Sequence, residues 1–398
     1  MTAPFPANDP AAPGASSRAV RFARVRAAMV EDGVDALLLS LGADLPWLTG
    51  YEAMPLERLT MLVVPAGDEA TLVVPRLEAP RVIPEPDLFR IRPWLDTENP
   101  ADIVASMVRR PTGPGSDSER AAGRRANPLR LAISDRTWAT SVLALQRRLP
   151  DAVWQLSSSI TAPLRAVKDD QEIEALAAAS AAADRVAAQL LKGEIPLIGR
   201  TEREVSKDIG RRLIAEGHQR VNFAIVGSGP NSASPHHEPG QRTIGPGEAV
   251  VCDFGGTMNG YCSDITRTVW TGSAEPVPQF IELYEILERA QAAGVRAATV
   301  GTACESIDAA ARDIIAAGGY GPDFIHRTGH GIGLEEHEDP YIVQGNTEPL
   351  APGHAFSVEP GIYLDGRYGA RIEDIVVATA SGPRSLNEVS HDLTVVDA

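Results

Sequence analysis

Nearly continuous apolar runs alternate with amphipathic stretches along the first part of the chain. Such runs are typical of strands that are buried on both faces of a sheet, and they predict strands at residues 35–40, 61–65, 71–75 and 129–134. Residues 18–32, which Gly33 follows, and residues 137–149 are predicted to be helices. Strands and helices in this order predict an α/β domain, expected at residues 18–163.

The second part of the chain combines long helices with antiparallel hairpins. Asp169 with Glu172, and Thr201 with Glu204, have the spacing of capping boxes, which mark the beginnings of two helices. The predicted helices cover residues 169–192, 201–217, 278–293 and 304–317, and the predicted strands and hairpin cover residues 222–226, 250–269, 355–360 and 370–378. This mixture predicts an α+β domain at residues 164–398.

Two segments lack any periodic pattern. Residues 1–17 are rich in Pro, Ala and Ser, and they are expected to form a disordered tail. This tail has neither the basic start nor the apolar core of a signal peptide. Residues 111–128, rich in Gly, Pro and charged side chains, predict a mobile surface loop or a small insertion.

Composition narrows the class of protein. The formal net charge of −16 argues against a nucleic-acid partner, because phosphate binding needs clustered Lys and Arg. The sequence contains no apolar run of about 18 residues, the length that could span a membrane. The three cysteines (Cys252, Cys262 and Cys304) show no CxxC spacing, which favours a reducing compartment over a disulfide scaffold. We therefore expect a soluble cytoplasmic protein.

A predicted hairpin in the second domain carries two aspartates. The Asn-Gly pair at residues 259–260 is a strong two-residue turn signal, and this register pairs Met258 with Tyr261. Because side chains alternate with period two, Asp253 and Asp264 then lie on one face, roughly 7–8 Å apart at the backbone. Such carboxylates repel unless they are protonated or share cations, and a pair of metal ions fits between them. The alternatives are a longer turn, or a solvated hairpin with two exposed acids.

Three further candidate ligands lie downstream. His330 stands between two glycines, which allow another group to approach the backbone closely. A loop of three or five residues centred on Gly366 would place Glu359 and Glu373 opposite each other on one face of a second hairpin. The five potential metal ligands are thus Asp253, Asp264, His330, Glu359 and Glu373.

The chemistry of this set favours a pair of hard divalent cations. Four carboxylates and one imidazole make an oxygen-rich site with a formal charge of −4, which two divalent ions would neutralise. Ligands of this kind suit Mn²⁺, with Co, Fe or Zn as alternatives, better than Cu(I) or an iron–sulfur cluster. Two such ions can hold a bridging hydroxide and stabilise an oxyanion.

Four motifs in order carry a family resemblance: D(x10)D, TGHGIG, VEPG and RIED. They resemble the pita-bread-fold metallopeptidases, in particular the branch of Xaa-Pro dipeptidase (prolidase) and aminopeptidase P. The resemblance extends from about Lys168 to the end of the chain, and the preceding domain resembles the creatinase-type N-terminal domain. It implies an α+β fold with a C-terminal pita-bread domain and a smaller N-terminal α/β domain.

The resemblance also implies roles for individual residues. Asp253 would chelate the first metal ion, and Asp264 and Glu373 would bridge both ions. His330 and Glu359 would bind the second ion, and Glu359 would also act as general acid and base.

Further residues carry substrate-binding roles in this family. His337 would contact the scissile carbonyl, and His236 would contact the substrate near its prolyl side. His237 adjoins His236, and the spacing to Asp253 favours His236. Arg371 and Tyr363 match supporting polar residues of the aminopeptidase P branch.

The implied activity is hydrolysis of the peptide bond before proline, with a dipeptide or oligopeptide as substrate and a homodimer as the assembly. A Xaa-Pro dipeptidase is favoured by the chain length, with aminopeptidase P as the alternative. A lyase or a non-peptide amide hydrolase on the same metal scaffold, and a non-catalytic binding module, also stay open because a fold does not determine its reaction.

Overall fold

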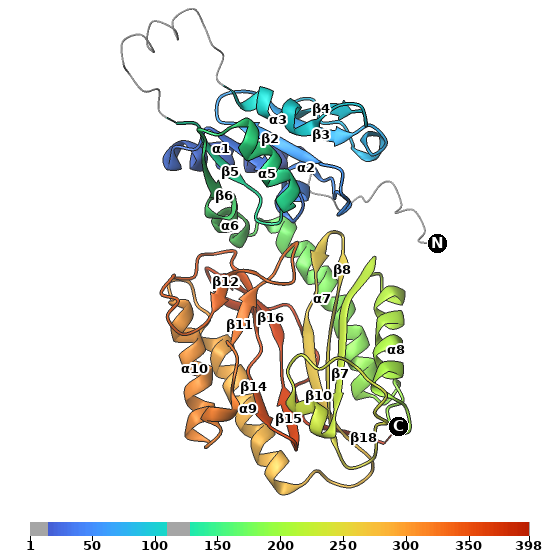
Figure 1. Cartoon of the computed structure of the whole chain (residues 1–398). Coiled ribbons are helices and arrows are strands. Elements are labelled where there is room, and N and C mark those ends of the chain that lie inside the picture. The colour runs from blue at the N-terminus through green and yellow to red at the C-terminus, as the bar shows by residue number, and fades with distance from the viewer. Residues whose placement is uncertain (1–14, 110–127, 398) are drawn as a thin grey trace, which may run out of the picture. The chain divides into compact units, whose positions relative to one another are not determined.

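The structure of the protein, a computed structural model, describes residues 15–109 and 128–397 (Figure 1). These residues form two compact units: the N-terminal unit ends at Leu164, and the C-terminal unit begins at Arg165. Nearly all of the predicted loop at residues 111–128 lies outside the described residues. No helix in the described part of the chain is long and apolar enough to cross a membrane.

The N-terminal unit is built on one mixed sheet with the strand order β4-β3-β2-β1-β5-β6. Its strands are β1 (Ala36–Leu39), β2 (Met61–Pro65), β3 (Ala70–Pro75), β4 (Phe89–Trp94), β5 (Arg130–Ile133) and β6 (Val153–Leu156). Its helices are α1 (Ala15–Asp32), α2 (Asp44–Thr49), α3 (Pro100–Val108), α5 (Ala139–Arg148) and α6 (Ser158–Ala166), with a 3-10 turn at η1 (Ala79–Arg81). All four predicted strands and both predicted helices of this unit are confirmed.

Two features of this unit differ from the prediction. The edge strands β4 and β6 lack a continuous apolar run: β4 reads FRIRPW, and the end residues Val153 and Leu156 of β6 are exposed. An edge strand has one pairing partner and needs less apolar surface. Helix α1 begins at Ala15, so the tail predicted for residues 1–17 is wrong at its last three residues; residues 1–14 lie outside the described residues.

The C-terminal unit contains two larger sheets and one small hairpin. The strands are β7 (Arg220–Ser228), β8 (Ala249–Met258), β9 (Tyr261–Cys262), β10 (Ile265–Thr271), β11 (Gly329–Gly331), β12 (Glu338–Ile342), β13 (Ala355–Val358), β14 (Gly361–Leu364), β15 (Tyr368–Arg371), β16 (Asp374–Thr379), β17 (Gly382–Ser385) and β18 (Thr394–Val396). One sheet has the order β18-β10-β8-β7, with β9 paired to β8, and the other has the order β12-β11-β13-β16-β17. Strands β14 and β15 pair with each other.

Four long helices cover these sheets: α7 (Asp170–Leu191), α8 (Glu202–Ala215), α9 (Pro278–Ala297) and α10 (Cys304–Ala317), with 3-10 turns at η2 (Gly229–Ala233) and η3 (Gly321–Asp323). Figure 1 shows α7 and α8 beside the first sheet and α9 and α10 beside the second. The apolar faces of α7 and α8 pack against strands in one buried cluster, and those of α9 and α10 pack against strands in another. Both predicted capping boxes are present, at Asp169 with Glu172 and at Thr201 with Glu204.

The first predicted hairpin has the expected register. Met258 pairs with Tyr261, and farther along Phe254 pairs with Ile265, which is the same register. Asn259 and Gly260 both have positive φ angles, 52° and 82°, as a type I′ turn requires. The two-residue turn is therefore confirmed, and Asp253 and Asp264 lie on the two arms of one hairpin.

The second hairpin also has its predicted register, but its outer strand is interrupted. Leu364 pairs with Tyr368 across a three-residue loop centred on Gly366, as expected. The strand predicted for residues 370–378 is two strands, because β15 ends before Glu373 and β16 begins after it. The amide of Glu373 instead donates to the carbonyl of Thr266 on β10. This crossing brings the two hairpins together.

Candidate metal centre

The five predicted ligands converge from five segments of the C-terminal unit. Ligand atoms of Asp264, His330 and Glu373 all lie within 4.8 Å of one another. His330 Nε2 lies 3.1 Å from Glu359 Oε1. In addition to burial, the charge of Glu359 raises the pKa of Asp253, and the charges of both raise the pKa of Asp264. The residues lie on β8 (Asp253), between β9 and β10 (Asp264), on β11 (His330), after β13 (Glu359) and between β15 and β16 (Glu373).

Three of the carboxylates each present an oxygen without a hydrogen-bond donor. Within the described part of the chain, Asp253 Oδ1, Asp264 Oδ1 and Glu373 Oε1 are buried and unpaired. A buried carboxylate oxygen without a partner is costly, and a cation is the partner that satisfies several of them at once. The donor set of oxygens with one imidazole nitrogen therefore fits hard divalent metal ions.

Burial and crowding make these carboxyl groups hard to ionise. Burial raises the pKa of Asp264 well above its usual value, and the neighbouring Glu373 carboxylate raises it further. Burial likewise raises the pKa of Glu373, with Glu359 adding to the effect. Burial also raises the pKa of Asp253, although the Arg371 guanidinium opposes the shift. Without metal, the site therefore retains protons that free carboxylic acids would have lost.

We expect metal binding to release protons. Because the raised pKa values keep Asp264 and Glu373 protonated at pH values where free acids are ionised, a cation must displace those protons. The apparent affinity for Mn²⁺ should fall as the pH is lowered. Calorimetric titration of chelator-treated protein in two buffers of different ionisation enthalpy measures the proton number. Binding without proton release, or affinity that rises on acidification, would contradict this expectation.

His330 is oriented by its neighbours on both sides. Its Nδ1 contacts the carbonyl of Gly331 at 3.1 Å, which leaves Nε2 directed at the carboxylates. A Cβ on Gly329 would lie 1.8 Å from the carbonyl oxygen of Ser357. The expectation that flanking glycines admit a close approach is therefore confirmed. The Ser357 hydroxyl accepts from the His330 amide and donates to Glu359 Oε1, both at 3.0 Å.

Arg371 and Tyr363 support the acidic ligands. The Arg371 guanidinium donates to Asp253 Oδ2 at 2.5 Å and to the Tyr363 hydroxyl at 2.8 Å. It also donates to Thr266 Oγ1, which in turn donates to Glu373 Oε2 at 2.6 Å. Two ligands are thus held by one chain of hydrogen bonds that starts at a buried cation.

His326 belongs to the same network, although the sequence interpretation left it without a role. Its Nε2 lies 2.9 Å from the Tyr363 hydroxyl, and its Nδ1 contacts the carbonyl of Arg327 at 2.7 Å. Burial lowers the pKa of His326, so the ring is neutral over a wider range than a free imidazole. Its position four residues before His330 was the signal that could have marked it.

The two predicted substrate-binding histidines lie near the same site. The His337 ring centroid is 4.0 Å from that of His330, and burial, followed by the charge of His330, lowers the pKa of His337 to about 4. His236 is exposed on the segment after η2, and its charge contributes to the lowered pKa values of both His326 and His337. The adjacent His237 contacts the Glu202 carboxylate at 2.8 Å instead. His236 and His237 are adjacent in sequence but have different surroundings.

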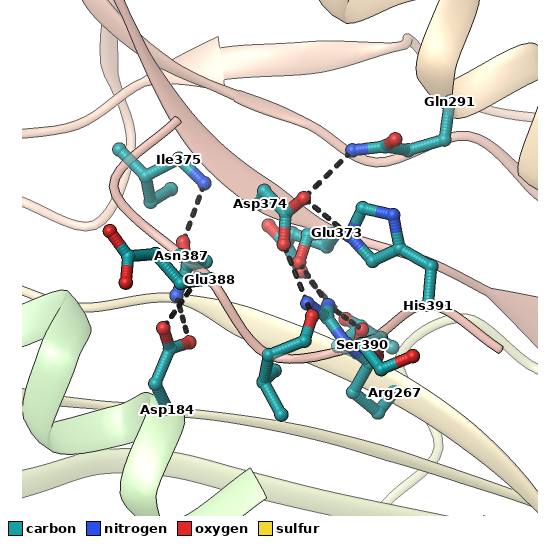
Figure 2. Close-up of polar contacts among 12 residues, drawn as sticks. Asp184, Arg267, Gln291, Glu373, Asp374, Ile375, Asn387, Glu388, Ser390 and His391 are labelled. Atoms are coloured by element: carbon teal, nitrogen blue, oxygen red, sulfur yellow. Dashed lines mark hydrogen bonds and ion pairs between the residues drawn. The ribbon is translucent and has the colours of Figure 1, made fainter. Parts of the chain in front are cut away.

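A second buried network holds the backbone of Glu373 (Figure 2). Arg267, only 1% exposed, donates to the Glu373 carbonyl at 2.7 Å and to Asp374 Oδ1 at 2.8 Å. Asp374 Oδ2 contacts Gln291 Nε2 at 3.0 Å and His391 Nε2 at 2.6 Å. We call Arg267, Gln291, Asp374 and His391 the Arg267 network. No local sequence pattern pointed to it.

Comparison with known protein families matches both parts of the chain. Residues 172–380 match the model of metallopeptidase family M24, and residues 21–167 match that of the creatinase/prolidase N-terminal domain. These matches confirm the predicted architecture, a creatinase-type domain followed by a pita-bread metallopeptidase domain.

Individual relatives cover nearly the whole chain. The probable dipeptidase PepE of Mycobacterium tuberculosis (strain ATCC 25618 / H37Rv) is 42% identical over 380 residues, which are 94% of this chain and 96% of the relative. The Xaa-Pro dipeptidase of Lactobacillus helveticus is 36% identical over 91% of this chain and 95% of its own length. The crystal structure of a recombinant prolidase from Thermococcus sibiricus superposes with a TM-score of 0.85 at 34% identity, covering 96% of this chain and all (100%) of the prolidase chain.

Proposed function

Because this chain belongs to metallopeptidase family M24, we propose that it is a Xaa-Pro dipeptidase that uses two divalent metal ions, Mn²⁺ first among them. The observation that carries the proposal is the convergence of Asp264, His330 and Glu373, all buried, with Glu359 beside His330, and the three unpaired carboxylate oxygens of Asp253, Asp264 and Glu373. Relatives named Xaa-Pro dipeptidase and prolidase support the substrate class.

The family resemblance supports a role for each ligand. Asp253 would bind one ion, and His330 with Glu359 would bind the other. Asp264 and Glu373, which each have ligand atoms within 4.8 Å of the other's, would bind both ions. When bound, two divalent ions polarise a carbonyl oxygen and lower the pKa of a water molecule.

The protein's own residues would move the proton and hold the substrate. Burial opposes ionisation of Glu359, but the hydrogen bond and charge of His330 outweigh it and lower the pKa of Glu359 below its usual value. The ionised carboxylate would take a proton from the attacking water and deliver it to the proline nitrogen. Neutral His337 would donate to the carbonyl oxygen as negative charge develops there. His236 would contact the prolyl side.

We also propose a cytoplasmic homodimer. All three cysteines lie in the described residues, and they are buried and free of disulfide bonds, which supports a reducing compartment. The family resemblance supports the dimer. Light scattering of the purified protein would measure the assembly directly, and a monomeric mass would refute it.

The activity test compares two substrates after removal of metal. We expect chelator-treated protein to be inactive and added Mn²⁺ to restore hydrolysis of Ala-Pro, with little cleavage of Ala-Pro-Gly. Cleavage of the tripeptide at a comparable rate would reassign the protein to aminopeptidase P. Hydrolysis of neither peptide by protein that binds two metal ions would point to a lyase or an amide hydrolase. Negligible metal binding by folded protein would point to a binding module.

A further inference from the structure

The segment that carries His236 is hydrogen-bonded to a buried carboxylate at the beginning of α8. The side chain of Glu202 is wholly buried, at 0% exposure. Its Oε1 accepts from the amide and hydroxyl of Ser228 and from Asn231 Nδ2, at 2.8–2.9 Å. Its Oε2 lies 2.8 Å from His237 Nε2 and accepts from the Gly240 amide at 3.3 Å. One carboxylate therefore contacts both ends of residues 228–240.

The hydrogen bonds that Glu202 accepts keep its carboxylate charged. Burial by itself would raise the pKa of Glu202, but hydrogen bonds from Asn231, His237 and Ser228 outweigh burial and lower it. Hydrogen bonds to an ionised carboxylate are roughly twice as strong as those between neutral groups. Residues 228–240 contain little regular structure beyond η2, so these contacts replace the backbone ladder that would hold a strand.

His236 lies between two anchored neighbours. On one side the carbonyl of Pro235 accepts from the Arg371 guanidinium at 3.3 Å. On the other side the His237 ring is held by Glu202. The His236 side chain itself forms no hydrogen bond or ion pair with any described residue, and it is exposed. Its backbone is fixed while its imidazole is left available.

We propose that Glu202 and His237 are positioning residues, which hold the 228–240 segment so that His236 faces the metal centre. The inference rests on the proposed function, in which His236 contacts the prolyl part of the substrate. In this proposal His237 stabilises the segment, and only His236 contacts the substrate.

A double-mutant cycle tests the coupling. We expect His237→Ala to lower kcat/KM for Ala-Pro about tenfold, mainly through KM, and to lower it no further once His236→Ala is present. His237→Gln, which keeps a donor toward Glu202, should recover part of the loss. The control is Glu204→Ala on the same helix, which removes an exposed capping residue that contacts Thr201 rather than the segment. Multiplicative losses in the double variant, or an equal KM change in Glu204→Ala, would overturn the proposal.

A second measurement does not depend on activity. It therefore tests the positioning role even if the proposed function is wrong. Hydrogen exchange of metal-loaded protein should show faster exchange at residues 228–240 in His237→Ala than in wild type, with α8 unchanged. Glu202→Gln should give a larger effect where the variant folds, because it weakens all the contacts of the carboxylate. Unchanged exchange in folded His237→Ala would overturn the proposal. Inactive wild type with the expected exchange would refute the substrate assignment alone.

Discussion

Replacing Glu359 with glutamine is expected to lower kcat for Ala-Pro by about 10²–10⁴-fold, the range of a lost general acid–base. Glutamine keeps the size of the side chain and an oxygen that can accept from the Ser357 hydroxyl, which lies 3.0 Å from Glu359 Oε1. It cannot take a proton from water at neutral pH, and it removes one negative charge from the site. The measurement is kcat at saturating Mn²⁺ beside the metal content of the same sample.

Metal content separates the two roles that Glu359 has in the proposal. A variant that binds two ions and stays inactive has lost the proton transfer, whereas a variant whose activity returns with excess Mn²⁺ has lost only a ligand. The matched control is Glu348→Gln, at an exposed glutamate of the same unit, which should behave as wild type. Activity of Glu359→Gln within a few-fold of wild type, at either metal level, would remove the general acid–base role.

The ligand geometry was predictable because it follows from two short-range rules. An Asn-Gly turn sets the register of the hairpin that carries Asp253 and Asp264, and a loop centred on Gly366 sets the register of β14 and β15, just beyond whose ends Glu359 and Glu373 lie. Period-two alternation then determines the face on which the side chains lie. Local turn chemistry thus carried most of the information about the site.

Contacts between distant segments were not predictable in this way. Arg267 and Asp374 are 107 positions apart, and Glu202 and His237 are 35 apart. No periodicity links such residues, and each type is common on protein surfaces. Strand β11 was also missed, because its sequence Gly-His-Gly has low strand propensity and is held by pairing on both sides. These features depend on packing rather than on local sequence.

Removal of the Asp374 carboxylate is expected to destabilise the C-terminal unit more than any single surface change, by about 3–5 kcal/mol. Asp374→Ala would leave Arg267, only 1% exposed, without its ion-pair partner, and Gln291 and His391 without their acceptor. The loss should appear as a lower guanidinium midpoint of the metal-free protein.

A paired replacement separates the buried charge from general packing. Because an uncompensated buried cation is the main cost, Arg267→Met with Asp374→Leu should be more stable than Asp374→Ala alone. Glu216→Ala, which breaks the more exposed ion pair with Arg185, should have a much smaller effect, since exposed pairs contribute little. Equal losses in Asp374→Ala and Glu216→Ala would show that the Arg267 network does not stabilise the unit. Since Arg267 also donates to the Glu373 carbonyl, weaker metal binding in folded Asp374→Ala would connect the network to the metal centre.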